Sequence, residues 1–261
     1  MDRNTKLIGV FGDSYADPNP IQYLDENLGR MPWPMWLEKL SGYQVHSHGL
    51  SATSTWYSYK QFLAHYKKYD TIVFCYSDLH RWHNINGDTH DGLYHIRYED
   101  QLALHVPKDS VRTAQTLVDA YKILHDWDFD KFVFQSIFDS VNKLCNAAGI
   151  KLINSLNFEE INGAPLPIDI TTTNNTVLTN LVQVSGSEFL RPNGSAKFTD
   201  IAKLIRTSAD KRFCHLNPHN NKVLAEIILD SVENDVRYVN LGTCDRFSYE
   251  YHDVSYLMEL N

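Results

Sequence analysis

Short, continuous apolar runs alternate with longer amphipathic segments along much of the chain. The runs lie at residues 7–11, 71–77 and 150–156, and a shorter candidate lies at 43–47. Continuous Val, Ile, Leu and Phe runs of this length are typical of strands in a parallel sheet that is covered on both faces. We therefore expect these segments to be buried strands of one sheet.

Segments with helical spacing of apolar residues separate the predicted strands. They cover residues 34–43, 110–127 and 130–150, and a fourth begins after Asn217, the predicted N-cap, with Pro218 at its first position. A glycine closes the first and the third of these segments. Strands that alternate with helices predict an α/β fold, here a three-layer α/β/α sandwich with a central parallel sheet.

Two long segments interrupt this alternation. Residues 83–109 and 157–200 are rich in Gly, Asn and Thr and only weakly periodic, so we interpret them as long insertions. No linker divides the chain, and residues 1–234 are predicted to form a single domain. We interpret the polar, Tyr-rich segment 235–261 as a C-terminal tail, whose packing the pattern does not define.

Composition and charge exclude several classes of protein. The hydrophobic fraction of 43% and the charged fraction of 21% are ordinary for a folded globular domain. A net charge of −8, without any run of Lys or Arg, argues against a nucleic-acid partner. No segment approaches the roughly 18 apolar residues of a membrane span, and no signal peptide is seen. We therefore expect a cytoplasmic or viral protein without a membrane partner, and leave its oligomeric state open.

The first predicted strand ends at Gly12, Asp13 and Ser14. Ligands of parallel α/β sheets bind at the carboxyl ends of the strands, so Ser14 is a candidate nucleophile, with an N-cap for the first helix as the alternative. A serine nucleophile needs a nearby base and donors for a developing oxyanion. His215 falls in the loop before the last predicted helix, whereas His219 falls in its first turn, so His215 is the candidate base.

Three blocks of the sequence resemble the SGNH, or GDSL-type, hydrolases. They read VFGDSYAD (10–17), WPMWLEKLSGYQVHSHGLSATST (33–55) and HLNPHNNKVLA (215–225), occur in the family's order and span almost the whole chain. The resemblance implies an SGNH-type, flavodoxin-like sandwich that hydrolyses esters. It also implies Ser14 as the nucleophile and His215 as the base.

The second and third blocks depart from the family pattern. Ser47 stands in place of an asparagine, and Ala52 stands in place of the glycine whose amide faces the oxyanion. The family's third block, which lies between the second and the last of those quoted above and is normally G-x-N-D, reads YSDLHRW (76–82) here, so the place of its donor asparagine falls to Ser77 or Leu79. We expect the amides of Ser14 and Ala52 to hold the oxyanion.

The missing asparagine and the missing acid both need substitutes. A polar group from Ser77, Asp78 or Arg81 is the expected replacement for the asparagine donor. The family's D-x-x-H would place an aspartate at 212, where this chain has Arg212. Asp210 is the candidate acid that orients His215, with a backbone carbonyl as the alternative.

Two tryptophans are candidate substrate contacts. Trp56 and Trp82 follow the second and third blocks and, together with Arg81, are predicted to line the cleft, with the long segment after Trp82 as its lid. Trp33 and Trp36 are spaced as core residues of a helix.

Clusters of metal-binding residue types are weak in this sequence. His46 and His48 share a face of a predicted strand, which leaves a metal-dependent hydrolase as one alternative, but no carboxylate accompanies them at ligand spacing. The cysteines lack C-x-x-C spacing, so we expect free thiols. We therefore predict neither a metal nor a cofactor. The cysteines are Cys75, Cys145, Cys214 and Cys244.

These features together predict a serine hydrolase. It would act as an esterase or carbohydrate O-deacetylase on a small-molecule or carbohydrate ester. Ser14 and His215 would form a dyad, or an irregular triad with Asp210. The alternative is a catalytically degenerate binding or structural module with the same fold, for example from a virus.

Overall fold

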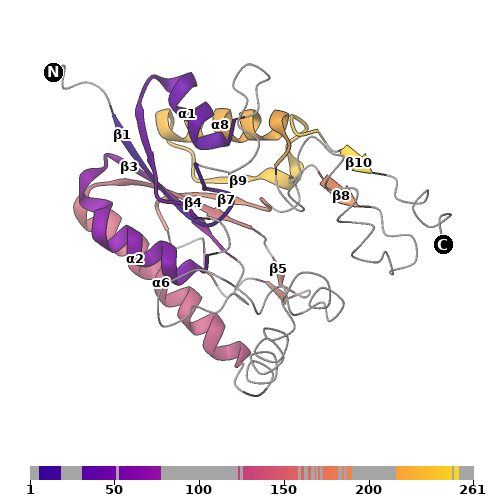
Figure 1. Cartoon of the computed structure of the whole chain (residues 1–261). Helices are drawn as coiled ribbons and strands as arrows, with labels where there is room; N and C mark the ends of the chain where they lie inside the picture. The colour runs from indigo at the N-terminus through magenta and orange to yellow at the C-terminus, as the bar shows by residue number, and fades with distance from the viewer. Residues whose placement is uncertain are drawn as a thin grey trace, which may run out of the picture.

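The computed structural model has a parallel sheet of six strands at its centre, in the order β2-β1-β3-β4-β7-β9 (Figure 1). The strands are β1 (Leu7–Phe11), β2 (Gln44–Ser47), β3 (Thr71–Tyr76), β4 (Lys151–Leu156), β7 (Thr176–Thr179) and β9 (Tyr238–Asn240). The structure describes residues 6–18, 31–50, 53–77, 123, 126–157, 160–161, 164–165, 168, 170, 173–181, 184, 187–189, 216–248 and 250–252.

Helices cover both faces of this sheet (Figure 1). The pair α1 and α8 packs on one face, and the pair α2 and α6 packs on the other. The predicted three-layer α/β/α sandwich with a central parallel sheet is thereby confirmed. The helices are α1 (Trp33–Ser41), α2 (Thr55–His65), α6 (Trp127–Ala148) and α8 (Pro218–Glu233), with the 3₁₀ turns η2 (Tyr66–Lys68) and η6 (Leu241–Thr243).

Burial on both faces explains the continuous apolar runs. All six residues of β3 are buried. Val73 and Cys75 point into the core beneath α1 and α8, whereas Ile72 and Phe74 point into the core beneath α2 and α6. A strand with two apolar faces cannot alternate between apolar and polar residues, so the run itself is the signal.

Two short strand pairs lie outside the main sheet. One is the antiparallel pair β5 (Glu160–Ile161) and β6 (Ala164–Pro165), and the other is the parallel pair β8 (Ser187–Phe189) and β10 (Glu250–His252). No helix in the described ranges is long and apolar enough to cross a membrane.

Most predicted boundaries agree with the structure within a few residues. The helix α1 begins one residue before its predicted start and ends at Gly42, which adopts a left-handed φ of 69° and donates its amide to the Glu38 carbonyl. The helix α8 begins at Pro218, and the side chain of Asn217 caps it by accepting the amide of Asn220 at 2.7 Å. These signals involve only residues a few positions apart, so they can be recognised in the sequence.

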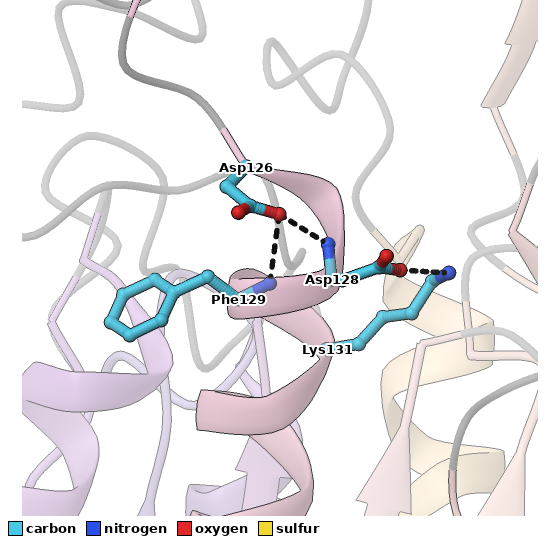
Figure 2. Close-up of polar contacts among 4 residues, drawn as sticks. All are labelled: Asp126, Asp128, Phe129 and Lys131. Carbon is cyan, nitrogen blue, oxygen red and sulfur yellow. Dashed lines mark hydrogen bonds and ion pairs between the residues drawn. The ribbon is translucent and has the colours of Figure 1, made fainter.

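The start of α6 differs from the prediction. Asp126 has extended backbone angles, and its carboxylate accepts the amides of Asp128 at 2.9 Å and Phe129 at 3.2 Å (Figure 2). It therefore caps a new helix, whereas the prediction placed it inside a helix over residues 110–127. The rest of that predicted helix lies outside the described residues, except for residue 123, which is helical.

Two strands of the main sheet were not predicted. β7 lies within residues 157–200, interpreted above as an insertion, and β9 lies within the segment 235–261, interpreted as a tail. Each has three or four residues, which is too short for a pattern to stand out. Pairing in the sheet defines them, for example through the amide of Val177, which donates to the Arg237 carbonyl at 2.7 Å. The predicted insertion at 83–109 lies outside the described residues.

Candidate active site

The turn that carries Ser14 directly follows β1 and is held by Asp13. The Asp13 carbonyl accepts the amide of Ala16 at 2.9 Å, and its carboxylate accepts the amide of Tyr15 at 3.0 Å. Asp13 is buried, so its carboxylate is a structural part of the turn. An aspartate that bonds the amide two residues ahead is a common way to stabilise a tight turn.

Gly12 allows this turn to pack directly on β3. A Cβ atom at Gly12 would lie 2.7 Å from the Cβ of Cys75 and 2.8 Å from the Cβ of Ala16. These separations are shorter than van der Waals contact, so a larger residue would push the turn away from the strand. Packing therefore requires Gly12, and the hydrogen bonds of the turn account for Asp13.

Ser14 itself is buried, with 8% of its surface exposed. No residue in the described part of the chain forms a hydrogen bond with its hydroxyl group. No helix begins between residues 14 and 18, so the N-cap interpretation of Ser14 is not supported. The hydroxyl is thus held in place by the backbone without being bonded to it.

The strand order puts Ser14 at a switch point of the topology, where strands are added first on one side of β1 and then on the other. From β1 the chain passes to β2 at one side of the sheet and then returns to β3 at the other side of β1. Ligands of open α/β sheets bind in the crevice outside the carboxyl ends of the strands at such a switch point. The position of Ser14 is therefore the expected binding position of this fold.

The loop after β2 is tied to the serine turn. The hydroxyl of Ser47 donates to the Ala16 carbonyl, and the amide of Gly49 donates to the Ser47 hydroxyl at 3.3 Å. A Cβ at Gly49 would lie 2.3 Å from the backbone of Ala16, so only glycine permits this approach. Ser47, which replaces the family's asparagine, therefore connects the serine turn to the loop that leads to Ala52.

Ser77 has a role other than the predicted one. Its side chain is fully buried, and its hydroxyl donates to the Thr53 carbonyl at 3.1 Å. Its amide donates to the hydroxyl of Thr55 at 3.0 Å, which ties the end of β3 to the start of α2. With its proton bonded to a backbone carbonyl, the Ser77 hydroxyl is not presented to a ligand as an oxyanion donor.

Trp56 lies at the second position of α2, beside this junction. Its ring is partly buried, packs against the core beneath α2 and α6, and lies 5.8 Å from the ring of Tyr59. Packing against the protein covers most of the surface of Trp56. Contact between the remaining exposed surface and a substrate stays a prediction.

Several predicted site residues, His215 among them, lie outside the described residues. The next residue, Leu216, is described. Leu216 is buried in the core beneath α1 and α8. His219 is exposed and its ring is 2.9 Å from the Arg246 carbonyl, as expected for a first-turn residue with no role in the site. The predicted residues outside the described ranges are Ala52, Asp78, Arg81, Trp82, Asp210 and His215.

A buried chain of hydrogen bonds links Tyr15 to Leu216, the residues that follow Ser14 and His215 in the sequence. The indole nitrogen of Trp33 donates to the Tyr15 carbonyl at 2.6 Å, next to Ser14. The amide of Trp33 donates to the side-chain oxygen of Asn221 at 2.9 Å. The side-chain nitrogen of Asn221 in turn donates to the Leu216 carbonyl at 2.9 Å. The start of helix α8 is thereby attached to the turn that carries Ser14.

The sequence analysis missed the role of this chain. Trp33 was expected in the core, where it is fully buried, but not as a bridge. Asn221 lies on the first turn of α8, where an asparagine reads as an ordinary polar residue. The available signal was three asparagines in five residues at a helix start, which exceeds what one N-cap needs.

His48, just after β2, and His65, at the end of α2, belong to an aromatic cluster. The ring of His48 stacks on Phe11 at 4.9 Å and on His65 at 4.6 Å, and its Nε2 lies 2.6 Å from the Tyr69 hydroxyl. Burial, followed by the neighbouring His65, His46 and Lys68, lowers the pKa of His48 to about 4. Within the described ranges, no three His, Cys, Asp or Glu side chains are grouped as a metal site.

Solved structures similar to this chain include proteins of the GDSL type, the family that the sequence blocks resemble. One, a G-D-S-L family lipolytic protein from Desulfitobacterium hafniense DCB-2, shares 14% identity at a TM-score of 0.44 over 87% of this chain and 99% of that chain. The acetyl xylan esterase AlAXEase shares 12% identity at a TM-score of 0.42, with the same coverage.

A GDSL-like lipase from Bacteroides thetaiotaomicron VPI-5482 shares 10% identity at a TM-score of 0.30, over 90% of this chain and 68% of that chain. No protein-family model matches the chain, and the comparison with curated proteins found no match. The α/β/α class of the fold rests on the sheet and its two helical layers.

Proposed function

We propose that the protein is a serine hydrolase that cleaves carboxylic esters, with Ser14 as the nucleophile. The observation that carries the proposal is the state of the Ser14 hydroxyl, which has no described hydrogen-bond partner although its residue is mostly buried at the switch point of a parallel sheet. By contrast, the hydroxyls of Ser47 and Ser77 are bonded to backbone carbonyls, and the unbonded hydroxyl of Ser155 lies within β4. A hydroxyl left unbonded on a turn that Asp13 holds suits a reacting group.

The proposed reaction has two steps. The Oγ of Ser14 forms a bond to the acyl carbon, its proton passes to His215, and the carbonyl electrons move to the oxygen. The bond to the leaving alcohol then breaks, and His215 returns the proton to that alcohol. Water repeats the sequence on the acyl-enzyme and restores Ser14. No cofactor takes part.

The bonded chain through Trp33 supports His215 as the base. Leu216, the next residue, is attached through Asn221 to the tryptophan that holds the Tyr15 carbonyl. A base must be held near its nucleophile to within a fraction of an ångström, and buried hydrogen bonds between the two segments supply that order. Asp210 is the proposed orienting acid.

The proposed oxyanion donors are the amides of Ser14 and Ala52. Donors aimed at the oxygen that gains charge are worth about 10²–10³ in kcat each. Because the Ser77 hydroxyl is bonded to Thr53, a third donor has to come from elsewhere, with Asp78 and Arg81 among the residues expected near it.

Hydrolysis of short-chain nitrophenyl esters and of acetylated sugars by the purified chain tests this proposal. Ser14→Ala and His215→Ala should each lower kcat by at least about 10³-fold, because neither group works without the other. Asp210→Asn should lower it less if a carbonyl also orients the imidazole. His219→Ala, on the same helix but exposed, should keep wild-type activity. Hydrolysis that survives both Ser14→Ala and His215→Ala would overturn the mechanism.

The alternative is a binding or structural module with a degenerate site. Two observations favour it: Ser77 is bonded to the backbone, and Arg212 stands at the position of the family's acid. A fluorophosphonate probe separates the two functions, because only an activated serine becomes phosphonylated. Labelling of the unaltered chain but not of Ser14→Ala supports the hydrolase, and a chain that stays unlabelled supports the module.

A further inference from the structure

Buried polar side chains follow the carboxyl ends of three neighbouring strands. Ser77 directly follows β3, Asn157 directly follows β4, and Asn180 directly follows β7. The pairing of β4 with both neighbours puts these three residues at the same level of the sheet. The three are therefore side by side at the edge where Ser14 lies.

Of these three residues, Asn157 differs in having no partner. The Ser77 hydroxyl is bonded to the Thr53 carbonyl, and the Asn180 amide nitrogen is bonded to Asn240 at 3.0 Å. Asn157 is 6% exposed, and its buried Oδ1 has no hydrogen-bond partner. No described residue bonds its amide nitrogen either.

Such a side chain is costly for the fold. Leaving a buried polar group without a partner destabilises a protein by about 1–3 kcal/mol, so native structures rarely keep one without a function. A small apolar residue at this position would avoid the cost. Trp36 and Ser155 also carry such an atom, but of these three residues only Asn157 lies at the carboxyl edge of the sheet.

The side chain of Asn157 lies on the face of the sheet where the proposed active site is expected. Along β4, Leu152 and Leu156 face the core beneath α2 and α6, whereas Ile153 faces the core beneath α1 and α8. Side chains alternate along a strand, so Asn157 continues the row of Ile153. That face also carries Leu216, the residue after His215.

We propose that Asn157 is a catalytic residue, a side-chain donor to the oxyanion of the ester. This inference rests on the proposed hydrolase function of Ser14. β4 lies two strand spacings from β1, roughly 10 Å, which leaves room between Ser14 and the amide of Asn157 for an ester carbonyl. The Nδ2 group, which has no bond to a described residue, is the part of the side chain that can donate to this oxygen, since Oδ1 only accepts.

The proposed role of Asn157 is to donate a hydrogen bond and nothing more. Its Nδ2–H donates to the carbonyl oxygen as that oxygen gains the electrons displaced by the attack of Ser14, and no bond to Asn157 forms or breaks. A neutral amide suits this task, since it donates at any pH and needs no proton returned. It would supply the third donor that Ser77 does not present.

The test is to compare activity and stability in Asn157→Ala. We expect kcat to fall by about 10²–10³-fold with KM changed by only a few-fold, because the lost bond forms fully only in the transition state. We expect the urea midpoint of unfolding to stay equal or to rise, because an unpartnered polar group has been removed. Asn157→Asp, which replaces the donor by a carboxylate of the same shape, should lose at least as much activity.

Ser155→Ala is the matched control. Ser155 lies two residues earlier on the same face of β4, and its buried hydroxyl also lacks an oxygen or nitrogen partner. Its replacement should leave kcat within about threefold of the unaltered chain while removing a similar polar atom from the same strand.

Two results would overturn the role of Asn157. One is kcat in Asn157→Ala that stays as close to the unaltered chain as Ser155→Ala does. The other is activity that falls only in proportion to a loss of stability. If the unaltered chain shows no hydrolysis that depends on Ser14, the proposed function fails first, and this inference fails with it.

Discussion

Trp33 donates its amide to the side-chain oxygen of Asn221 at 2.9 Å, although 188 positions separate the two residues in the chain. Because the indole of Trp33 also donates to the Tyr15 carbonyl, one fully buried residue joins the turn after β1 to helix α8. In this fold the proposed nucleophile and base come from opposite ends of the sequence. The bridge through Trp33 holds the residues next to them, Tyr15 and Leu216, in a fixed relation.

Replacing Trp33 by Phe should destabilise the fold and slow the proposed chemistry. The change leaves the buried Tyr15 carbonyl without its donor and opens a small cavity, so we expect the free energy of unfolding to fall by about 1–3 kcal/mol. Fluorophosphonate labelling of Ser14 should slow in the protein that remains folded. Urea unfolding and the labelling rate measure the two effects.

The same substitution at Trp36, one turn further along α1, is the control. The indole nitrogen of Trp36 is buried but has no acceptor among the described residues, so Trp36→Phe removes an unpartnered donor. We expect a smaller loss of stability and an unchanged labelling rate. Equal effects at the two positions would show that the bond to Tyr15 is not what matters.

A methyl group at Gly12 should displace the serine turn. The Cβ of Gly12→Ala would meet Cys75 and Ala16 at under 3 Å, and such overpacking costs about 1–3 kcal/mol. Gly42→Ala is the matched change, because nothing lies within 4 Å of its Cβ and only the left-handed backbone is strained, at about 1 kcal/mol. Labelling of Ser14 should slow in Gly12→Ala alone. A Gly12→Ala chain that is labelled at the unaltered rate would mean that the turn tolerates the shift.

Acid should destabilise the protein through His48. Burial holds its pKa at about 4, below the value of about 6.5 in an unfolded chain, so between these values the unfolded state binds the additional proton. The free energy of unfolding should therefore fall as pH decreases from about 6.5 to about 4. His48→Phe keeps the stack with Phe11 and should reduce this fall.

Urea unfolding at several pH values in this window measures the effect. Tyr69→Phe is the control, since it removes the hydroxyl beside His48 but keeps the imidazole. It should lower stability at all pH values and retain the acid-dependent fall. If the slope in His48→Phe equals that of the unaltered chain, other groups cause the acid sensitivity.

The cap of α6 should be worth more than the ion pair beside it. Asp126→Ala removes the acceptor of two helix amides and should cost about 1 kcal/mol, with a range of roughly 0.5–2. Asp128→Ala removes an exposed ion pair of 3.2 Å with Lys131, which contributes at most about 1 kcal/mol and commonly less (Figure 2). Thermal unfolding compares the two. A larger loss of stability in Asp128→Ala would show that charge, and not capping, is what stabilises the start of α6.

Local signals account for the parts of the fold that the sequence predicted. Asn217 and Pro218 start a helix, Gly149 ends one, and the run over residues 71–77 is apolar because β3 is buried on both faces. Each signal depends on neighbours a few positions away. By contrast, β7 has four residues and β9 has three, and their partners lie far along the chain, so no local pattern identified them.

The candidate site likewise has some features that the sequence predicted and others that only the folded structure shows. The sequence determined that a serine ends the first buried strand and that a histidine precedes the last helix, because strand ends and helix starts are written in neighbouring residues. Only the tertiary structure decided that Ser77 is bonded to Thr53 and that Asn157 has no partner. The physical reason is that a polar group is satisfied or left unbonded by atoms that folding brings from distant positions, and a linear sequence does not carry those distances.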